Sequence, residues 1–143
     1  MSIVFAESVK EYEYRAALIQ FRKDQPGLAW GLTYRPEGTA YYFPKLGVYC
    51  CLKKVKPGVI EVTGVFRARG NERGAAQAIV DLCRTFKYTY IVLDCFSYVE
   101  HVWIAAGFSV IDRKRFNLSA APRLWVPVYG QPEVVYMQQY IGD

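Results

Sequence analysis

The chain has 143 residues, of which 52% are hydrophobic and 22% are charged, and its formal net charge is +5. This length and composition are typical of one globular domain and exclude a largely disordered chain. No apolar run approaches the roughly 18 residues of a membrane helix, and the first residues do not form a signal peptide. We therefore expect a cytoplasmic protein without a membrane partner, whose positive charge suits an anionic ligand.

The four cysteines are expected to be reduced, buried thiols rather than metal ligands. Cys50 and Cys51 are adjacent, so in a strand their side chains point to opposite faces. Cys83 and Cys95 stand alone, and the chain contains a single histidine. These spacings do not match a closed zinc site, so we expect no metal.

The N-terminal third carries weak signals. Residues 2–6 are compatible with a short strand. Apolar positions with helical spacing predict a helix over 9–23, carried by Tyr12, Ala16 and Ile19, with Leu18 and Phe21 as further candidates. Residues 25–27 (Gln-Pro-Gly) end that helix. We expect 28–44 to be irregular or weakly stranded.

The middle of the chain is clearer. Residues 46–55 and 59–66 are rich in strand-forming side chains and are separated by Lys-Pro-Gly, which predicts a β-hairpin. A basic loop, 67–73, follows. Ala78, Ile79, Leu82 and Phe86 then recur at helical spacing and predict a helix over 74–86.

The remaining elements alternate between strand and helix. We expect an apolar strand at 88–95, a helix at 97–106 ended by Gly107, a strand at 108–111 and a last strand at 133–140. Residues 117–132 form a long connection. Strand–helix–strand alternation indicates an α/β or α+β sheet with right-handed crossovers.

Residues 65–76 lead from a strand through a glycine-containing turn into a helix. Such a turn can bind an anion, because the first helical N–H groups are unpaired and the helix dipole favours negative charge. Gly74 lets a phosphate approach the backbone, and Ala75 and Ala76 keep the entrance small. Positive charge is supplied by Arg67, Arg69 and Arg73. The same layout also occurs in plain strand–helix connections.

Two motifs in this order resemble the GNAT (N-acetyltransferase-like) superfamily. Asn71-Glu72-Arg73-Gly74-Ala75-Ala76 resembles its pyrophosphate motif, [Gln/Arg]-x-x-Gly-x-[Gly/Ala], with Asn at the first position. Residues 103–108 resemble its Tyr-x-x-x-Gly-Phe segment, with Trp103 in place of Tyr. The helix and strand between the two motifs also match the family.

A narrower resemblance covers about residues 59–137. The stretches that carry it are Leu93-Asp94-Cys95-Phe96, Gly107-Phe108, Arg113, Phe116-Asn117, Trp125 and residues 132–137. Together they look like a GNAT-like subgroup common in phages and prophages. That subgroup would place the protein in a host cytoplasm.

The resemblance implies a GNAT-like, mixed and largely antiparallel sheet with a central β-α-β-α-β core that binds acyl-CoA. Residues 1–143 would form one domain, with 1–45 as the N-terminal helix and acceptor region and 46–140 as the cofactor-binding core and C-terminal strands. Acetyl-CoA or another acyl-CoA would bind through Val65, Phe66, Arg67, residues 71–76 and Trp103. The pantetheine arm would enter where the strand ending near Phe66 parts from the strand at 88–95.

The implied reaction is direct attack of an amine on the thioester, which needs a base and often an acid. Glu61 is the best base candidate, although it could be a solvent-facing strand charge. Asp94 is a second candidate, although it could cap the helix at 97–106 or make a structural hydrogen bond. Trp103 replaces the family's acidic Tyr, and an indole N–H does not supply a proton. Tyr98 is the candidate substitute.

Other groups and functions stay open. His101 is more simply a packed or solvated side chain, and Cys95 a buried thiol. The first functional hypothesis is an acyl-CoA-dependent N-acyltransferase with an unknown amine acceptor. The alternative is a non-catalytic GNAT-fold phage protein that binds a host protein. A nucleic-acid-binding module is the weakest option, because no recognisable motif supports it.

Overall fold

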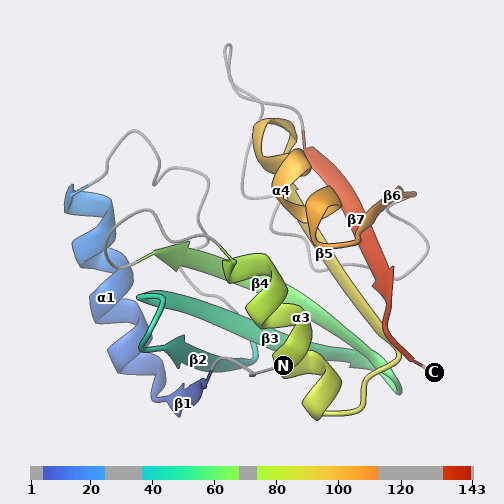
Figure 1. Ribbon diagram of the computed structural model, residues 1–143. Coiled ribbons are helices and arrows are strands. Elements are labelled where there is room, and N and C mark those ends of the chain that lie inside the picture. Colours follow the sequence, from blue (N-terminus) through green and yellow to red (C-terminus); the bar gives the residue numbers. More distant parts are fainter. Residues whose placement is uncertain (1–4, 25–36, 68–73, 113–133, 143) are drawn as a thin grey trace.

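The computed structural model describes residues 5–24, 37–67, 74–112 and 134–142, which form a mixed α+β fold around a seven-stranded sheet (Figure 1). The strand order is β1-β2-β3-β4-β5-β7-β6, and every neighbouring pair is antiparallel except β4 and β5. The strands are β1 (Glu7–Val9), β2 (Thr39–Phe43), β3 (Val48–Lys56), β4 (Val59–Arg67), β5 (Tyr90–Phe96), β6 (Ser109–Ile111) and β7 (Val134–Tyr140). The helices are α1 (Glu11–Asp24), α3 (Ala75–Thr85) and α4 (Glu100–Ala105), with a 3-10 turn at Ser97–Val99.

The two faces of the sheet carry different helices. Ala78 and Ile79 of α3 and Trp103 of α4 pack in one cluster with Cys50, which defines the α3 face. The other face, the α1 face, carries Tyr14 and Leu18 of α1 in a second cluster with Cys51. The expectation that Cys50 and Cys51 point to opposite faces is therefore confirmed.

The hairpin of β3 and β4 is confirmed. It forms because Pro57 fixes its own φ and Gly58 adopts the positive φ of 80° that the turn requires. The hairpin lies in the centre of the sheet. Its position brings β4 beside β5, the one parallel pairing.

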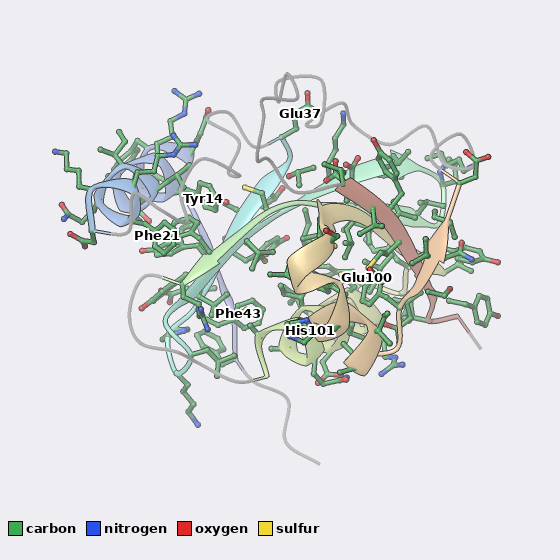
Figure 2. All side chains as sticks on the ribbon, turned by 90° about the horizontal axis from the view of Figure 1, so that it is seen from above. Tyr14, Phe21, Glu37, Phe43, Glu100 and His101 are labelled. Atoms are coloured by element: carbon green, nitrogen blue, oxygen red, sulfur yellow. The ribbon has the colours of Figure 1, made fainter. Side chains whose placement is uncertain are left out.

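Helix α1 is confirmed, but its expected apolar positions are right only in part, because Leu18 and Phe21 pack on the sheet whereas Tyr12, Ala16 and Ile19 are exposed. Tyr12 and Ile19 are 66% and 51% exposed, whereas Tyr14 and Leu18 are only 2% exposed each. The exposed residues and the buried residues each recur at helical spacing, so periodicity alone could not show which of the two helix faces packs on the sheet. The helix face that packs on the sheet carries Tyr14 and Phe21, whose rings contact Phe66 of β4 (Figure 2).

One further N-terminal expectation needs correction, and a second is made more definite. The strand expected at 2–6 is not present at Phe5 and Ala6, and the first strand is instead Glu7–Val9, while residues 1–4 lie outside the described part. Within the region expected to be irregular or weakly stranded, Thr39–Phe43 is a regular strand paired on both sides. Residues 25–36 lie outside the described part.

Helix α3 and strand β5 occur where expected. Ala78 and Ile79 are buried, but Phe86 is 41% exposed because the helix ends at Thr85 and Phe86 is its C-cap. The helix expected at 97–106 is divided into the 3-10 turn and α4. Gly107 ends it with a φ of 104°, as predicted.

The last strand occupies an internal position. β7 pairs with β5 over seven residues, from Tyr90 opposite Tyr140 to Phe96 opposite Val134, and pairs with β6 on its other side. The long connection expected at 117–132 lies outside the described residues.

Candidate functional site

Strands β4 and β5 pair over only part of their lengths. Their parallel register runs from Val59 opposite Tyr90 to Val62 opposite Leu93. Beyond that pair β4 continues to Arg67 and β5 to Phe96. Figure 1 shows the two strands diverging, β4 toward α1 and β5 toward α4. The parting expected between these strands is therefore present.

A β-bulge lies at the same place. In the β3–β4 ladder, Leu52 pairs with Val62 and Cys51 with Gly64, so Thr63 is an extra residue. The Thr63 hydroxyl lies 2.6 Å from the Glu37 carbonyl oxygen, which accepts its hydrogen bond. An isolated glycine inside a strand pattern, here Gly64, is the sequence signal that could have revealed the bulge.

The bulge changes which face each later residue of β4 occupies. Ile60 and Val62 lie on the α3 face, and simple alternation would place Phe66 there too. Instead Phe66 is buried in the α1-face cluster and Val65 takes the α3 face. The Phe66 ring stacks on Tyr49, with centroids 5.2 Å apart, and meets Tyr14 edge to face at 5.2 Å. The diverging end of β4 is therefore anchored to α1.

Glu61 and Asp94 share one face of the sheet. Glu61 pairs with Val92, and Asp94 is two residues further along β5, so both side chains lie on the α1 face. Glu61 is 1% exposed, the one buried charged residue among those described, and Asp94 is half-buried. Glu61 is one residue before Val62 on β4, and Asp94 is one residue after Leu93 on β5, where Val62 and Leu93 are the last ladder pair before the strands diverge. A carboxylate here could accept a proton from a group bound on this face.

The N-terminus of α3 begins at a glycine that has free space beside it among the described residues. Gly74 precedes the helix with a φ of 87°, and its carbonyl accepts the Ala78 N–H at 2.9 Å. Gly74 has no side chain to cap the N–H groups of the first turn. A Cβ built on Gly74 would meet no heavy atom of the described residues within 4 Å. Ala75 is half-buried and Ala76 is buried.

Several expected site residues fall at the margin of this region or outside it. Asn71, Glu72 and Arg73 lie outside the described residues. Val65 and Arg67, both half-buried, lie on the diverging end of β4.

Trp103 does not join the two carboxylates. Its ring is buried on the α3 face and meets Phe108 edge to face at 5.3 Å. The backbone of Tyr98 lies in the 3-10 turn directly after β5, and its side chain is not described. His101 is exposed on α4 (Figure 2).

Cys95 is protonated at neutral pH. Burial, followed by the negative charges of Asp94 and Glu100, raises the pKa of its thiol to about 12. Its sulfur lies 3.8 Å from the Met137 sulfur. These surroundings agree with a structural thiol, because a nucleophile needs the thiolate form.

Comparison of the amino-acid sequence with protein-family models and with curated proteins gives no match. Comparison of the structure with solved structures finds similar proteins. The ribosomal-protein-S18-alanine N-acetyltransferase of Escherichia coli aligns with a TM-score of 0.60 at 10% identity, over 97% of this chain and 94% of that one. An acetyltransferase of Bacillus subtilis in complex with CoA aligns with a TM-score of 0.59 at 12% identity, over 95% and 97%. An acetyltransferase of the GNAT family from Staphylococcus aureus gives 0.57 at 14%, over 95% and 98%.

These likenesses span nearly the whole of each chain and show that the protein has the GNAT fold. The mixed, largely antiparallel sheet expected from the sequence is confirmed. Within the described residues, no three His, Cys, Asp or Glu side chains gather where they could bind a metal ion. In the same part of the chain, no helix is long and apolar enough to cross a membrane.

Proposed function

We propose that this protein is an acyl-CoA-dependent N-acyltransferase, with acetyl-CoA or another acyl-CoA as donor and an amine as acceptor. The observation that carries the proposal is the end of the β4–β5 ladder at Val62, with the buried carboxyl of Glu61 one residue before it on β4. The start of α3 at Gly74 adds a separate candidate for an anion site. Structural neighbours with the same fold include one that binds CoA.

The proposed binding mode uses backbone groups. The end of β4 (Val65, Phe66 and Arg67) is not laddered to β5, so its N–H and C=O groups on that side can pair with the pantetheine amides. The first N–H groups of α3 can hold the pyrophosphate, helped by the helix dipole. Gly74 suits this role because a Cβ there would project into open space. Asn71, Glu72, Arg73, Ala75 and Ala76 complete the proposed loop, and Trp103 supports it from the core.

In the proposed reaction the neutral amine attacks the thioester carbonyl carbon. A C–N bond forms, the C–S bond breaks, and the thiol of CoA is released. Glu61 accepts the proton that the amine loses, either directly or through one water. Asp94 on the same face helps to hold the cationic acceptor before it is deprotonated. Tyr98, directly after β5, is proposed to donate the proton to the leaving sulfur.

Thermal unfolding tests the cofactor step. A ligand at a hundred times its Kd adds roughly 2.7 kcal/mol to the free energy of unfolding. We expect acetyl-CoA to raise the melting temperature, and adenosine to give a smaller rise because it lacks the pyrophosphate and the pantetheine. The absence of a rise with any acyl-CoA would contradict the proposal.

Glu61→Gln tests the base, since the amide keeps the size of the carboxyl but cannot take up the proton. With an amine acceptor in hand, we expect this variant to bind acetyl-CoA normally and to lose kcat about a hundredfold or more. Asp94→Asn should chiefly raise KM for a cationic amine. If Glu61→Gln turns over normally, Glu61 is not the base.

One observation favours the second candidate, a non-catalytic GNAT-fold phage protein that binds a host protein in the host cytoplasm. The tryptophan in the acid position is buried against Phe108 and cannot supply a proton. Under this alternative the chain binds CoA weakly or not at all. Hydrolysis and transfer assays with a panel of amines would then give no turnover, and Glu61→Gln would change nothing measurable.

A further inference from the structure

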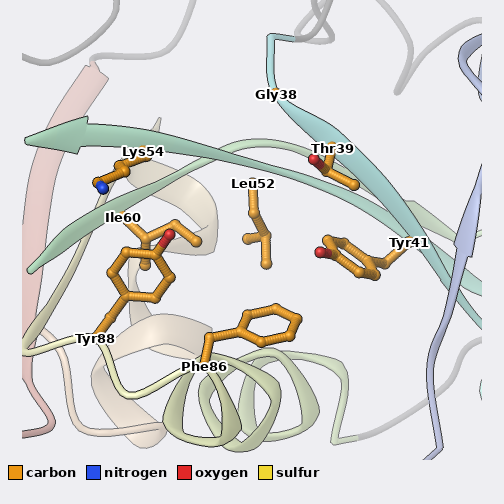
Figure 3. A pocket seen from close by; sticks show the side chains of 8 residues that line it. All are labelled: Gly38, Thr39, Tyr41, Leu52, Lys54, Ile60, Phe86 and Tyr88. Carbon is orange, nitrogen blue, oxygen red and sulfur yellow. The ribbon is translucent and has the colours of Figure 1, made fainter.

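A cavity separate from the diverging strands lies on the α3 face, between the C-terminal end of α3 and strands β2 to β4 (Figure 3). Its volume is about 370 Å³. It is far from the start of α3, because an eleven-residue helix is about 16 Å long and Gly74 and Phe86 flank its two ends. The cavity is therefore distinct from the proposed acyl-CoA site.

The cavity has an apolar floor and aromatic walls. Leu52 and Ile60 form the floor, and the rings of Tyr41, Phe86 and Tyr88 surround it (Figure 3). The Tyr41 and Phe86 rings lie 5.6 Å apart between centroids, in a tilted contact. An open space bounded by three rings suits a flat apolar ligand.

The turn after α3 fixes two of these rings. Lys87 has a φ of 62°, the one positive φ among the described non-glycine residues. Its N–H donates to the Arg84 carbonyl at 3.0 Å, and the Tyr88 N–H donates to the Cys83 carbonyl at 3.5 Å. A glycine would adopt this conformation at lower cost. The turn places Phe86 and Tyr88 on neighbouring walls of the cavity.

Each polar side chain around the cavity can donate a hydrogen bond. The donor groups are the hydroxyls of Thr39, Tyr41 and Tyr88 and the ammonium group of Lys54, and among the described residues no carboxylate lines the cavity. Lys53, the preceding residue, forms a salt bridge with Glu37, whereas Lys54 forms none with the described residues. Burial raises the pKa of Tyr41, so its hydroxyl keeps the proton that it can donate. The lining therefore favours a ligand with a negative group that accepts hydrogen bonds.

We propose that this cavity binds a small aromatic carboxylate. The ring of the ligand lies over Leu52 and Ile60 among the aromatic side chains, and its carboxylate meets Lys54 and the hydroxyls at the rim. This inference does not depend on the proposed acyl transfer, because the two sites use opposite ends of α3.

Ligand-observed NMR with naphthoate tests the proposal, with naphthylmethanol as the uncharged analogue of similar shape. We expect saturation transfer to naphthoate at millimolar concentration and a clearly weaker signal for naphthylmethanol. Equal signals from the two probes, or no signal from naphthoate, would overturn the proposal. Acyl-CoA is absent from the sample, so the result is independent of the enzyme proposal.

Variants assign the signal to the cavity. Lys54→Met should weaken naphthoate binding about tenfold, which is about 1.4 kcal/mol. Lys56→Met is the matched control, because Lys56 is on the same strand and does not line the cavity. Phe86→Leu should also weaken binding of both probes, and Phe86 is exposed enough for the fold to survive. Equal affinities for Lys54→Met and Lys56→Met, with unchanged melting temperatures, would refute the assignment.

Discussion

Val62 of β4 and Leu93 of β5 form the last ladder pair before these two strands diverge. Both side chains are buried on the α3 face. Replacing Leu93 by Ala removes apolar contacts at the point of separation and leaves a cavity, so we expect a loss of about 2–5 kcal/mol in the free energy of unfolding. Urea denaturation followed by circular dichroism measures it. A loss below about 1 kcal/mol would show that this position relaxes easily.

Phe66 is expected to stabilise the attachment of α1 to the sheet. Phe66→Ala removes ring contacts with Tyr49, Tyr14 and Phe21 and should cost about 3–5 kcal/mol. Hydrogen exchange should accelerate in α1 more than in α3, because α3 packs on the other face. Ile19→Ala is the control in the same helix, and we expect a change within about 0.5 kcal/mol because that side chain is half-exposed. A larger effect of Ile19→Ala than of Phe66→Ala would contradict the observed helix face.

The two glycines Gly38 and Gly74 should differ sharply in their tolerance of Ala. Both have a positive φ, which costs an alanine roughly 1–2 kcal/mol. A Cβ on Gly74 meets open space, whereas one on Gly38 would lie 2.0 Å from the Leu52 carbonyl oxygen. Gly38→Ala should therefore be the more destabilising change by several-fold. Thermal denaturation of the two variants tests this, and equal losses would be the contrary result.

Buried thiols should make the protein less stable at alkaline pH. Burial raises the pKa of Cys83 and of Cys51 from 9.0 to about 12 in the folded state. Between pH 9 and about pH 12 the folded chain keeps thiol protons that the unfolded chain has released. The stabilisation that these thiols contribute is therefore fully present below pH 9 and is lost as the pH rises above it. Each thiol contributes a slope of about 1.4 kcal/mol per pH unit.

Urea midpoints measured from about pH 8 to about pH 10.5 check this slope. The Cys83→Ala variant should be less stable at neutral pH but should show a shallower decline, because one titrating thiol is gone. An identical decline in the wild type and the variant would show that Cys83 keeps an ordinary pKa when folded.

Local signals predicted the centre of the fold well. The Pro57-Gly58 turn, the periodicity of Ala78 and Ile79, and the stop at Gly107 each depend on a few neighbouring residues, so they can be identified from the sequence. The apolar face of α1 could not be chosen, because two stripes have helical spacing and only the contacts of Tyr14 with the sheet select one. The insertion of β7 between β5 and β6 is a long-range pairing, which local patterns do not encode.

The candidate site was predicted in part. Strand positions and motif order made Glu61, Asp94 and Gly74 candidates, but the face that each carboxyl occupies depends on the strand register. The bulge at Thr63 was missed, although Gly64 marks it, and it moves Phe66 to the α1 face. The roles of Glu61, Asp94, Tyr98 and the residues of the α3 loop stay predictions until the variants above are measured.

Among the described strands, the three-residue strands β1 and β6 form the two margins of the sheet. Exposed backbone at a sheet margin is where a second chain can add a strand and begin to aggregate. Each margin offers such a chain only a few hydrogen bonds, while the nine-residue strands lie inside the sheet. The strand order therefore shields the longest and most apolar strands from edge-to-edge association.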